Sequence, residues 1–120
     1  MSHIIVIDDD CQVRLMLKKM LESEGYRVTV ASNGNEGIKS QRDNPADLII
    51  TDLIMPEKEG IETISELKQE FPDIKIIAMS GGGKNEPGVY LHAAKIIGAI
   101  HTFHKPIKKD ELLGTIKSLI

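Results

Sequence analysis

The sequence predicts an α/β fold, a doubly wound (βα)5 sandwich with a parallel sheet covered by helices on both faces. Five short apolar runs recur along the 120 residues, and helix-like segments alternate with them. Strands that alternate with helices form right-handed crossovers, which make the sheet parallel and cover both of its faces. The runs are IIVI (4–7), VTVA (28–31), LIIT (48–51), IIAM (76–79) and IHTF (100–103).

The first helix is predicted from an apolar stripe with helical spacing between the first two runs. Asp10 precedes this stripe and is expected to cap the helix, and Gly25 follows it as a stop signal. The first, third and fourth apolar runs are continuous rather than alternating, which indicates strands that are buried on both faces. The stripe consists of Val13, Met16, Leu17, Met20 and Leu21.

Four further helices follow from similar signals. Asn33 and Glu36 have the spacing of a capping box at the start of the second helix. The third carries a stripe that Pro72 ends, and the fourth is expected to run from about Pro87 to Ile97, before Gly98. The stripe of the third helix is Ile61, Ile64, Leu67 and Phe71, and that of the last is Leu112, Leu113, Ile116, Leu119 and Ile120.

Composition excludes several classes of function. Aromatic residues make up only 3% of the chain and tryptophan is absent, which argues against a surface that stacks bases or a flavin. The formal net charge of −3 argues against direct nucleic-acid binding. No run is long enough for a membrane span, and the single cysteine, Cys11, fits a reducing compartment. We therefore expect one cytoplasmic domain over residues 1–120.

Polar residues follow four of the predicted strands. Because ligands of open α/β sheets bind beyond the carboxyl ends of the strands, these residues are expected to converge. Two carboxylates about 5 Å apart repel by roughly 3 kcal/mol at an effective dielectric constant near 20, so a cluster of acids needs compensation. Mg²⁺, which prefers carboxylate, water and phosphate oxygens, would supply it. The residues are Asp8, Asp9 and Asp10 after the first strand, Asp52 after the third, Ser80 after the fourth and Lys105 after the fifth.

Four motifs together resemble the receiver domain of two-component response regulators, a family that includes chemotaxis regulators. They are VIDDD (6–10), TDLIMPEKEG (51–60), MSG (79–81) and HKP (104–106), and they occur in the order and spacing of that family. The resemblance covers essentially the whole chain. It implies a flavodoxin-like fold with strand order 2-1-3-4-5, a single receiver domain over residues 1–120, and a cis peptide before Pro106.

The resemblance also implies the chemistry of the site. Asp52 would accept a phosphoryl group as an acyl phosphate. Lys105 would pair with phosphoryl oxygens, and Ser80 would donate a hydrogen bond to one of them. The main-chain amides of Leu53 and Gly81 are expected to assist, so that catalysis is chiefly positioning and charge neutralisation.

The implied cofactor is Mg²⁺. The resemblance assigns Asp9, Asp52 and the main-chain carbonyl of Ile54 as direct ligands, and Asp8 as a ligand that acts mainly through a bound water. The apolar side chain of Ile54 cannot orient an attacking water, so we also expect slow autodephosphorylation, which an Ile54→Asn variant should accelerate.

The implied partners are a sensor histidine kinase or phosphotransfer protein upstream and, downstream, a protein or an output domain absent from this chain. No direct nucleic-acid or membrane contact is expected. The protein would not be a turnover enzyme, since it would catalyse only its own aspartyl phosphorylation and dephosphorylation. Partner specificity is expected at surface positions of the first helix, such as Arg14, Leu15 and Lys18.

One position departs from the family pattern. Receivers usually have Tyr or Phe three residues before the conserved lysine, and the ring moves when the hydroxyl residue turns toward the phosphoryl group. Thr102 occupies that position here. The switch would then use another lever, such as Phe103, Tyr90 or the glycine-rich segment GGGK (81–84), or its coupling would be weaker.

Two alternatives stay open at the level of sequence. Asp8 and Asp10 form the D-x-D pattern of haloacid dehalogenase-type phosphatases, although Gln12 stands where that family usually has Thr or Val, and the chain is short for a cap. A degenerate receiver that serves as a constitutive docking module is the second alternative.

Overall fold

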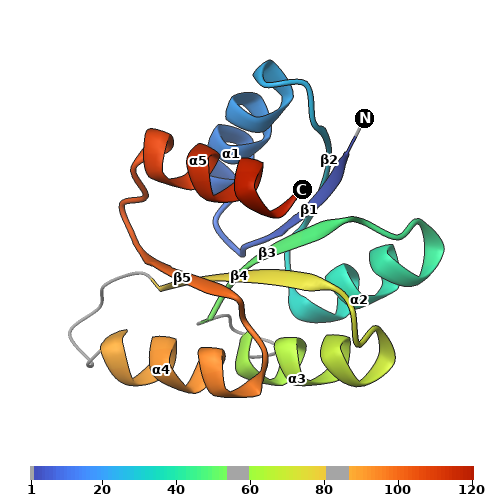
Figure 1. Ribbon diagram of the computed structural model, residues 1–120. Coiled ribbons are helices and arrows are strands. Elements are labelled where there is room, and N and C mark those ends of the chain that lie inside the picture. Colours follow the sequence, from blue (N-terminus) through green and yellow to red (C-terminus); the bar gives the residue numbers. More distant parts are fainter. Residues whose placement is uncertain (1, 54–59, 81–86) are drawn as a thin grey trace.

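The predicted fold class is confirmed by the computed structural model, which describes residues 2–53, 60–80 and 87–120. These residues form a five-stranded parallel sheet of order β2-β1-β3-β4-β5 with five helices (Figure 1). The strands are β1 (His3–Ile7), β2 (Arg27–Ala31), β3 (Leu48–Asp52), β4 (Lys75–Ser80) and β5 (His101–His104). The helices are α1 (Cys11–Ser23), α2 (Gly34–Asp43), α3 (Gly60–Glu70), α4 (Pro87–Ile97) and α5 (Lys109–Leu119).

The helices form two layers on the sheet. In Figure 1, α1 and α5 lie together on one face, and α3 and α4 lie side by side on the other. Two apolar clusters fill the spaces between these layers and the sheet. Leu17 and Ile116 belong to the cluster under α1 and α5, whereas Ile38, Leu67 and Ala94 belong to the cluster under α2, α3 and α4.

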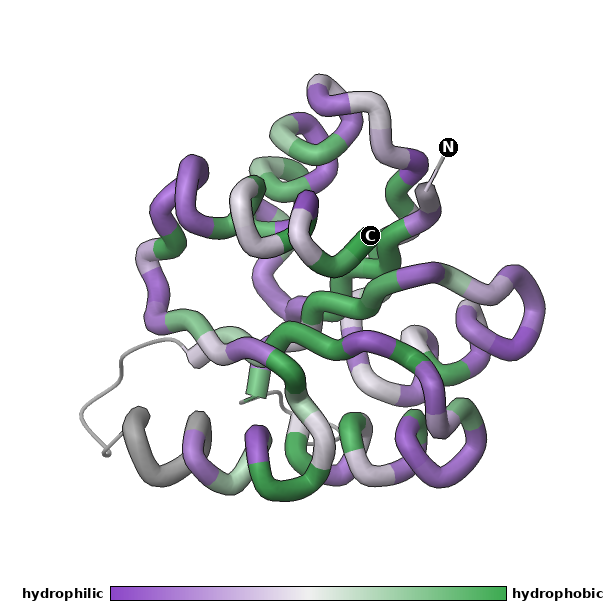
Figure 2. The backbone as a smooth tube through the Cα atoms, viewed as in Figure 1, coloured by the Kyte–Doolittle hydropathy of each residue, from purple (hydrophilic) through white to green (hydrophobic). Residues whose placement is uncertain are grey.

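The three central strands are the most apolar part of the molecule, as Figure 2 shows by colour. β1 and β3 are buried along their whole length, and β4 is buried after Lys75. The two edge strands, β2 and β5, are partly exposed. Burial on both faces of the central strands is what their continuous apolar runs predict. Within the described residues, no helix has the length and apolarity to cross a membrane.

Strand boundaries differ slightly from those predicted, and the differences bear on the site. β3 and β4 extend far enough to include Asp52 and Ser80 as their last residues, so the backbone of both residues is held by the sheet ladder. β5 begins one residue later than predicted: the Ile100 amide already bonds to the Ile76 carbonyl (2.8 Å), but the ladder with β4 starts at His101.

Helix ends follow the predicted capping signals. The Asp10 carboxylate accepts a hydrogen bond from the Gln12 amide, and the Asn33 side chain accepts one from the Glu36 amide. Gly25, with φ +92°, turns the chain after α1 in a conformation that disfavours residues with a Cβ. Met16 is an exception to the predicted α1 stripe, since it is 51% exposed.

Candidate functional site

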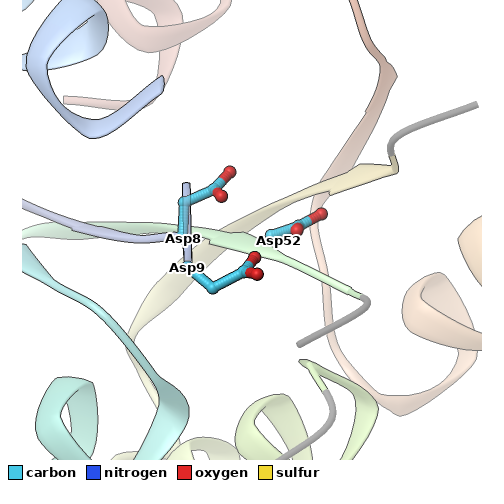
Figure 3. A group of neighbouring side chains, drawn as sticks. All are labelled: Asp8, Asp9 and Asp52. Atoms are coloured by element: carbon cyan, nitrogen blue, oxygen red, sulfur yellow. The ribbon is translucent and has the colours of Figure 1, made fainter. Parts of the chain in front are cut away.

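Three carboxylates converge at the carboxyl ends of two neighbouring strands. Asp8 and Asp9 directly follow β1, and Asp52 ends β3, which pairs with β1 through Ile7 and Thr51. Figure 3 shows the three side chains gathered at this edge of the sheet. One ligand oxygen from each carboxylate lies within 4.8 Å of the others. The sequence-based prediction that these acids come together is therefore confirmed.

Lys105 compensates much of the charge in this cluster. Its Nζ lies 2.7 Å from Oδ2 of Asp8 and 3.6 Å from Oδ2 of Asp52. Its backbone is anchored as well, because the Lys105 amide donates to the Ser80 carbonyl (2.8 Å) and the predicted cis peptide precedes Pro106. The pairing with Asp8 explains how a fully buried carboxylate is tolerated here.

The Asp52 carboxyl group is electrostatically strained. Its pKa is raised from 3.8 to about 6, chiefly by burial and then by the neighbouring charge of Asp8, against the opposing effect of Lys105. Burial lowers the pKa of Lys105, but its hydrogen bond to Asp8 and the charge of Asp52 outweigh that effect, so the pKa is raised overall. Such perturbed groups in contact are typical of functional sites.

Asp10 does not belong to the cluster. Its main-chain amide donates to Oδ1 of Asp8 (2.9 Å), and its own Oδ1 accepts from the Gln12 amide (2.8 Å). The carboxylate of Asp10 therefore caps α1, as predicted. The phosphatase alternative needed Asp10 beside Asp8 as an acid–base group, and this capping role leaves that alternative without support.

Ser80 is buried with its hydroxyl unused. The side chain has no exposed area, and Oγ lacks a hydrogen-bond partner among the described residues. A buried polar atom without a partner costs free energy, so natural proteins keep few of them. This hydroxyl is suited to donate to an oxygen of a ligand bound at the strand ends.

The backbone around Asp52 is closely packed. Oδ1 of Asp52 accepts from the Leu53 amide (3.0 Å), and the Gly60 amide donates to the Leu53 carbonyl (2.9 Å). A Cβ on Gly60 would lie 2.2 Å from the Asp52 carbonyl oxygen. The glycine that begins α3 therefore allows this helix to pack directly against the backbone of Asp52.

The donors at this site fit Mg²⁺. Hard divalent cations prefer oxygen ligands, and a few carboxylates that leave room for water and phosphate oxygens are characteristic of magnesium. Asp8, Asp9 and Asp52 offer such oxygens. Ile54 and Gly81, for which the resemblance implied a carbonyl ligand and a helping amide, lie outside the described residues, as does GGGK (81–84).

The structure shows where the residues around Thr102 lie, the position at which receivers usually have an aromatic residue. Thr102 pairs with Ala78, and Phe103 pairs with Met79 and packs in the cluster under α1 and α5. Side chains alternate between the two faces of a sheet along each strand. Thr102 and Ser80 therefore lie on the face opposite to that of Phe103 and Met79, toward α4. Phe103 therefore lies on the wrong face to replace the aromatic lever, while the side chain of Tyr90 is not among those described.

Arg14 makes a contact near the site that no sequence pattern predicts. Its Nη1 donates to the main-chain carbonyl of Asp8 (2.7 Å), directly behind the acidic cluster. Arg14 is one of the positions of the first helix at which partner specificity is expected, yet its guanidinium bonds within the domain. A side chain that returns six residues along the chain to a main-chain carbonyl leaves no periodic signal.

The comparisons with known proteins agree with this fold and site. The family model of the response regulator receiver domain matches residues 4–117, and the chain belongs to this family of two-component signalling proteins. It is 31% identical over 120 residues to the transcriptional regulatory protein CpxR of Klebsiella pneumoniae. The match takes in all of this chain but 50% of that relative, so the chain spans about half the length of this curated relative.

Two solved structures are especially similar. A response regulator receiver domain protein from Clostridium thermocellum is 30% identical with a TM-score of 0.91, covering 100% of this chain and 94% of that one. Response regulator TrrA from Thermotoga maritima is 32% identical with a TM-score of 0.86, with 100% of both chains covered; that structure is a complex with Mg²⁺–BeF.

Proposed function

We propose that this receiver domain accepts a phosphoryl group on Asp52 from the phosphohistidine of a sensor histidine kinase or phosphotransfer protein. The observation that carries the proposal is the position of Asp52 at the end of β3, within 4.8 Å of the Asp8 and Asp9 oxygens and 3.6 Å from Lys105. The strand-end location and the family of the chain support it.

The transfer is a displacement at phosphorus. An oxygen of the ionised Asp52 carboxylate forms the new P–O bond, the P–N bond to the imidazole breaks, and the neutral donor histidine leaves after gaining a proton. With a pKa of about 6, Asp52 is mostly ionised at pH 7. The Leu53 amide holds one Asp52 oxygen, which fixes the orientation of the carboxylate.

Two side chains of this protein would stabilise the transferred group. Lys105, already 3.6 Å from Asp52, would neutralise a phosphoryl oxygen, and the Ser80 hydroxyl, which has no partner in the described part of the chain, would donate to another. Asp8, Asp9, Asp52 and the Ile54 carbonyl would hold Mg²⁺, with Asp8 acting mainly through water. Bound Mg²⁺ would neutralise charge on the phosphoryl oxygens.

The wider role follows from the same proposal. Phosphorylation would shift the domain between two conformations that a downstream protein or an output domain reads. The chain would act as one receiver domain over residues 1–120, in the cytoplasm, and would catalyse only its own phosphorylation and dephosphorylation. We propose no direct contact with nucleic acid or membrane.

Intact-protein mass after incubation with acetyl phosphate and Mg²⁺ tests the proposal. Wild-type protein should gain one phosphoryl group, whereas Asp52→Asn and a metal-free sample should gain none. Asp10→Asn is the matched control, because it removes an acid of the same triplet that only caps α1, and it should still be phosphorylated. A folded wild type that gains nothing would contradict the proposal and favour the docking module.

A further inference from the structure

Arg14 connects the second turn of α1 to the end of β1. Its main-chain amide donates to the Asp10 carbonyl (3.0 Å) within the helix, while its guanidinium reaches back to the Asp8 carbonyl (2.7 Å). The guanidinium thus binds the chain where it leaves the sheet and turns into the helix. This turn carries two of the three carboxylates of the cluster.

The carbonyl that Arg14 holds controls more than Asp8. A peptide unit is planar, so the direction of the Asp8 carbonyl sets the plane that joins Asp8 to Asp9. Asp8 itself is fixed at other atoms, because its amide bonds to the Ala31 carbonyl (3.1 Å) and its carboxylate to Lys105 (2.7 Å). Asp9 is exposed, so the peptide plane is a principal restraint on where its side chain points.

The charge of the guanidinium also acts on a carboxylate of α2. Glu36, in the first turn of α2, accepts hydrogen bonds from the hydroxyl and the amide of Ser32, the latter at 2.9 Å. These bonds lower the pKa of Glu36 most, and the charge of Arg14 contributes a smaller part in the same direction. The charge of Arg14 therefore acts on an ionised carboxylate at the start of α2, while its guanidinium bonds to the acidic turn after β1.

We propose that Arg14 is a positioning residue for the acidic cluster: by holding the Asp8 carbonyl, it orients the Asp8–Asp9 peptide so that both carboxylates face Asp52. This inference deepens the proposed function, on which it rests for the use of the cluster. Arg14 does not touch the reacting atoms. Its contribution is to the geometry of the residues that hold the cation.

The sign of the effect on Mg²⁺ distinguishes positioning from a simple charge effect. If Arg14 were only a nearby positive charge, its removal would strengthen Mg²⁺ binding, because like charges repel. If it positions the ligands, its removal weakens binding, and residues that orient metal ligands contribute roughly 10-fold or more to affinity. A partner-facing Arg14 would leave Mg²⁺ affinity unchanged.

The experiment is a calorimetric titration of Mg²⁺ into the metal-free 120-residue chain without a phosphodonor. Arg14→Ala should weaken binding by roughly 10-fold. Arg14→Lys keeps the charge but loses the planar fork, so it should fall between Arg14→Ala and wild type. The matched control is Arg42→Ala, which removes an arginine that bonds to Glu70 (2.6 and 2.7 Å) at the other end of the sheet, and should bind as wild type does.

Urea unfolding in EDTA completes the test. A merely structural role would lower the free energy of unfolding of Arg14→Ala while leaving the Mg²⁺ affinity of the folded protein as in wild type, and that result would overturn the inference. Equal or tighter Mg²⁺ binding by Arg14→Ala would overturn it too. Should Arg14→Ala fail to fold, Arg14→Lys decides, and wild-type affinity in that variant would count against positioning.

The two proposals fail separately. Wild type that binds Mg²⁺ but gains no phosphoryl group from acetyl phosphate would contradict the proposed function, while the titration would still decide the role of Arg14. Phosphorylated wild type with unchanged Mg²⁺ binding in both Arg14 variants would overturn the inference alone. Wild type that binds no Mg²⁺ would overturn the inference directly.

Discussion

The two ends of the parallel sheet differ in how far their buried polar side chains are satisfied by hydrogen bonds and ion pairs. At the amino end of the strands, His3 and Gln41 are buried and bonded through both of their polar side-chain atoms. At the carboxyl end, three acids crowd together, one with a raised pKa, and the Ser80 hydroxyl is unpaired among the described residues.

The amino end shows what a buried polar group needs for stability alone. Gln41 accepts from the Ala46 amide (2.7 Å) and donates to the Ala46 carbonyl (3.4 Å). The His3 ring lies 2.7 Å from the Thr29 hydroxyl and 3.3 Å from the Pro45 carbonyl. These bonds give each polar side-chain atom of His3 and Gln41 a partner within the protein. At the carboxyl end, by contrast, the clustered carboxylates and the Ser80 hydroxyl are left to bind a ligand.

The largest effect on stability should come from adding a side chain at Gly60, next to the backbone of Asp52. A Cβ in Gly60→Ala would meet the Asp52 carbonyl oxygen and the Leu53 Cα, both main-chain atoms that cannot rotate away. We expect a loss of about 3 kcal/mol in unfolding free energy, since overpacking commonly costs 1–3 kcal/mol and here the clash is with backbone. Urea unfolding measures it.

Gly114→Ala is the matched control for this clash. A Cβ at Gly114, within α5, has no neighbour within 4 Å, and alanine favours helix over glycine by about 1 kcal/mol. This variant should be slightly stabilised. Similar changes in both variants would mean that the packing of α3 against Asp52 is looser than described.

A smaller and opposite effect is expected from Asp52→Asn in metal-free protein. The folded-state pKa of Asp52 is about 6 against 3.8 unfolded, so the folded state binds the proton more tightly and wild-type stability falls as pH rises from about 4 to 6. Removing this charge should stabilise the protein at pH 7 by roughly 2–3 kcal/mol, at 1.36 kcal/mol per pKa unit.

The pH dependence checks the origin of that gain. Urea unfolding in EDTA at pH 4, 5, 6 and 7 should show the advantage of Asp52→Asn shrinking toward zero as pH approaches 4, where the wild-type carboxyl is protonated. A gain that stays constant over this range would contradict an electrostatic cause. Millimolar Mg²⁺ should stabilise wild type more than the variant.

The smallest effect separates the two ends of the sheet directly. Ser80→Ala removes a hydroxyl without a described partner, so its unfolding free energy should change by less than about 1 kcal/mol. Gln41→Leu, at the other end, leaves the amide and carbonyl of Ala46 buried and unpaired, which should cost about 1–3 kcal/mol. Equal losses in thermal or urea unfolding would refute the contrast.

Much of the fold was predictable from local patterns. Apolar runs predict the five described strands, and stripes, capping signals and Pro or Gly positions predict the five described helices, with the caps at Asp10 and Asn33 evident from short-range spacing. The convergence of Asp8, Asp9 and Asp52 followed from a general rule about strand ends. The strand order came from the family resemblance, because local patterns do not determine which strands pair.

What the sequence by itself determined is therefore the elements, their alternation and the identity of the polar residues at the strand ends, since these depend on neighbours along the chain. Tertiary structure alone decided that Lys105 pairs with Asp8, that Phe103 faces away from α4, that Gly60 packs on the backbone of Asp52 and that Arg14 holds the Asp8 carbonyl. These contacts depend on burial, side-chain direction and the meeting of segments up to 97 residues apart, which no local periodicity encodes.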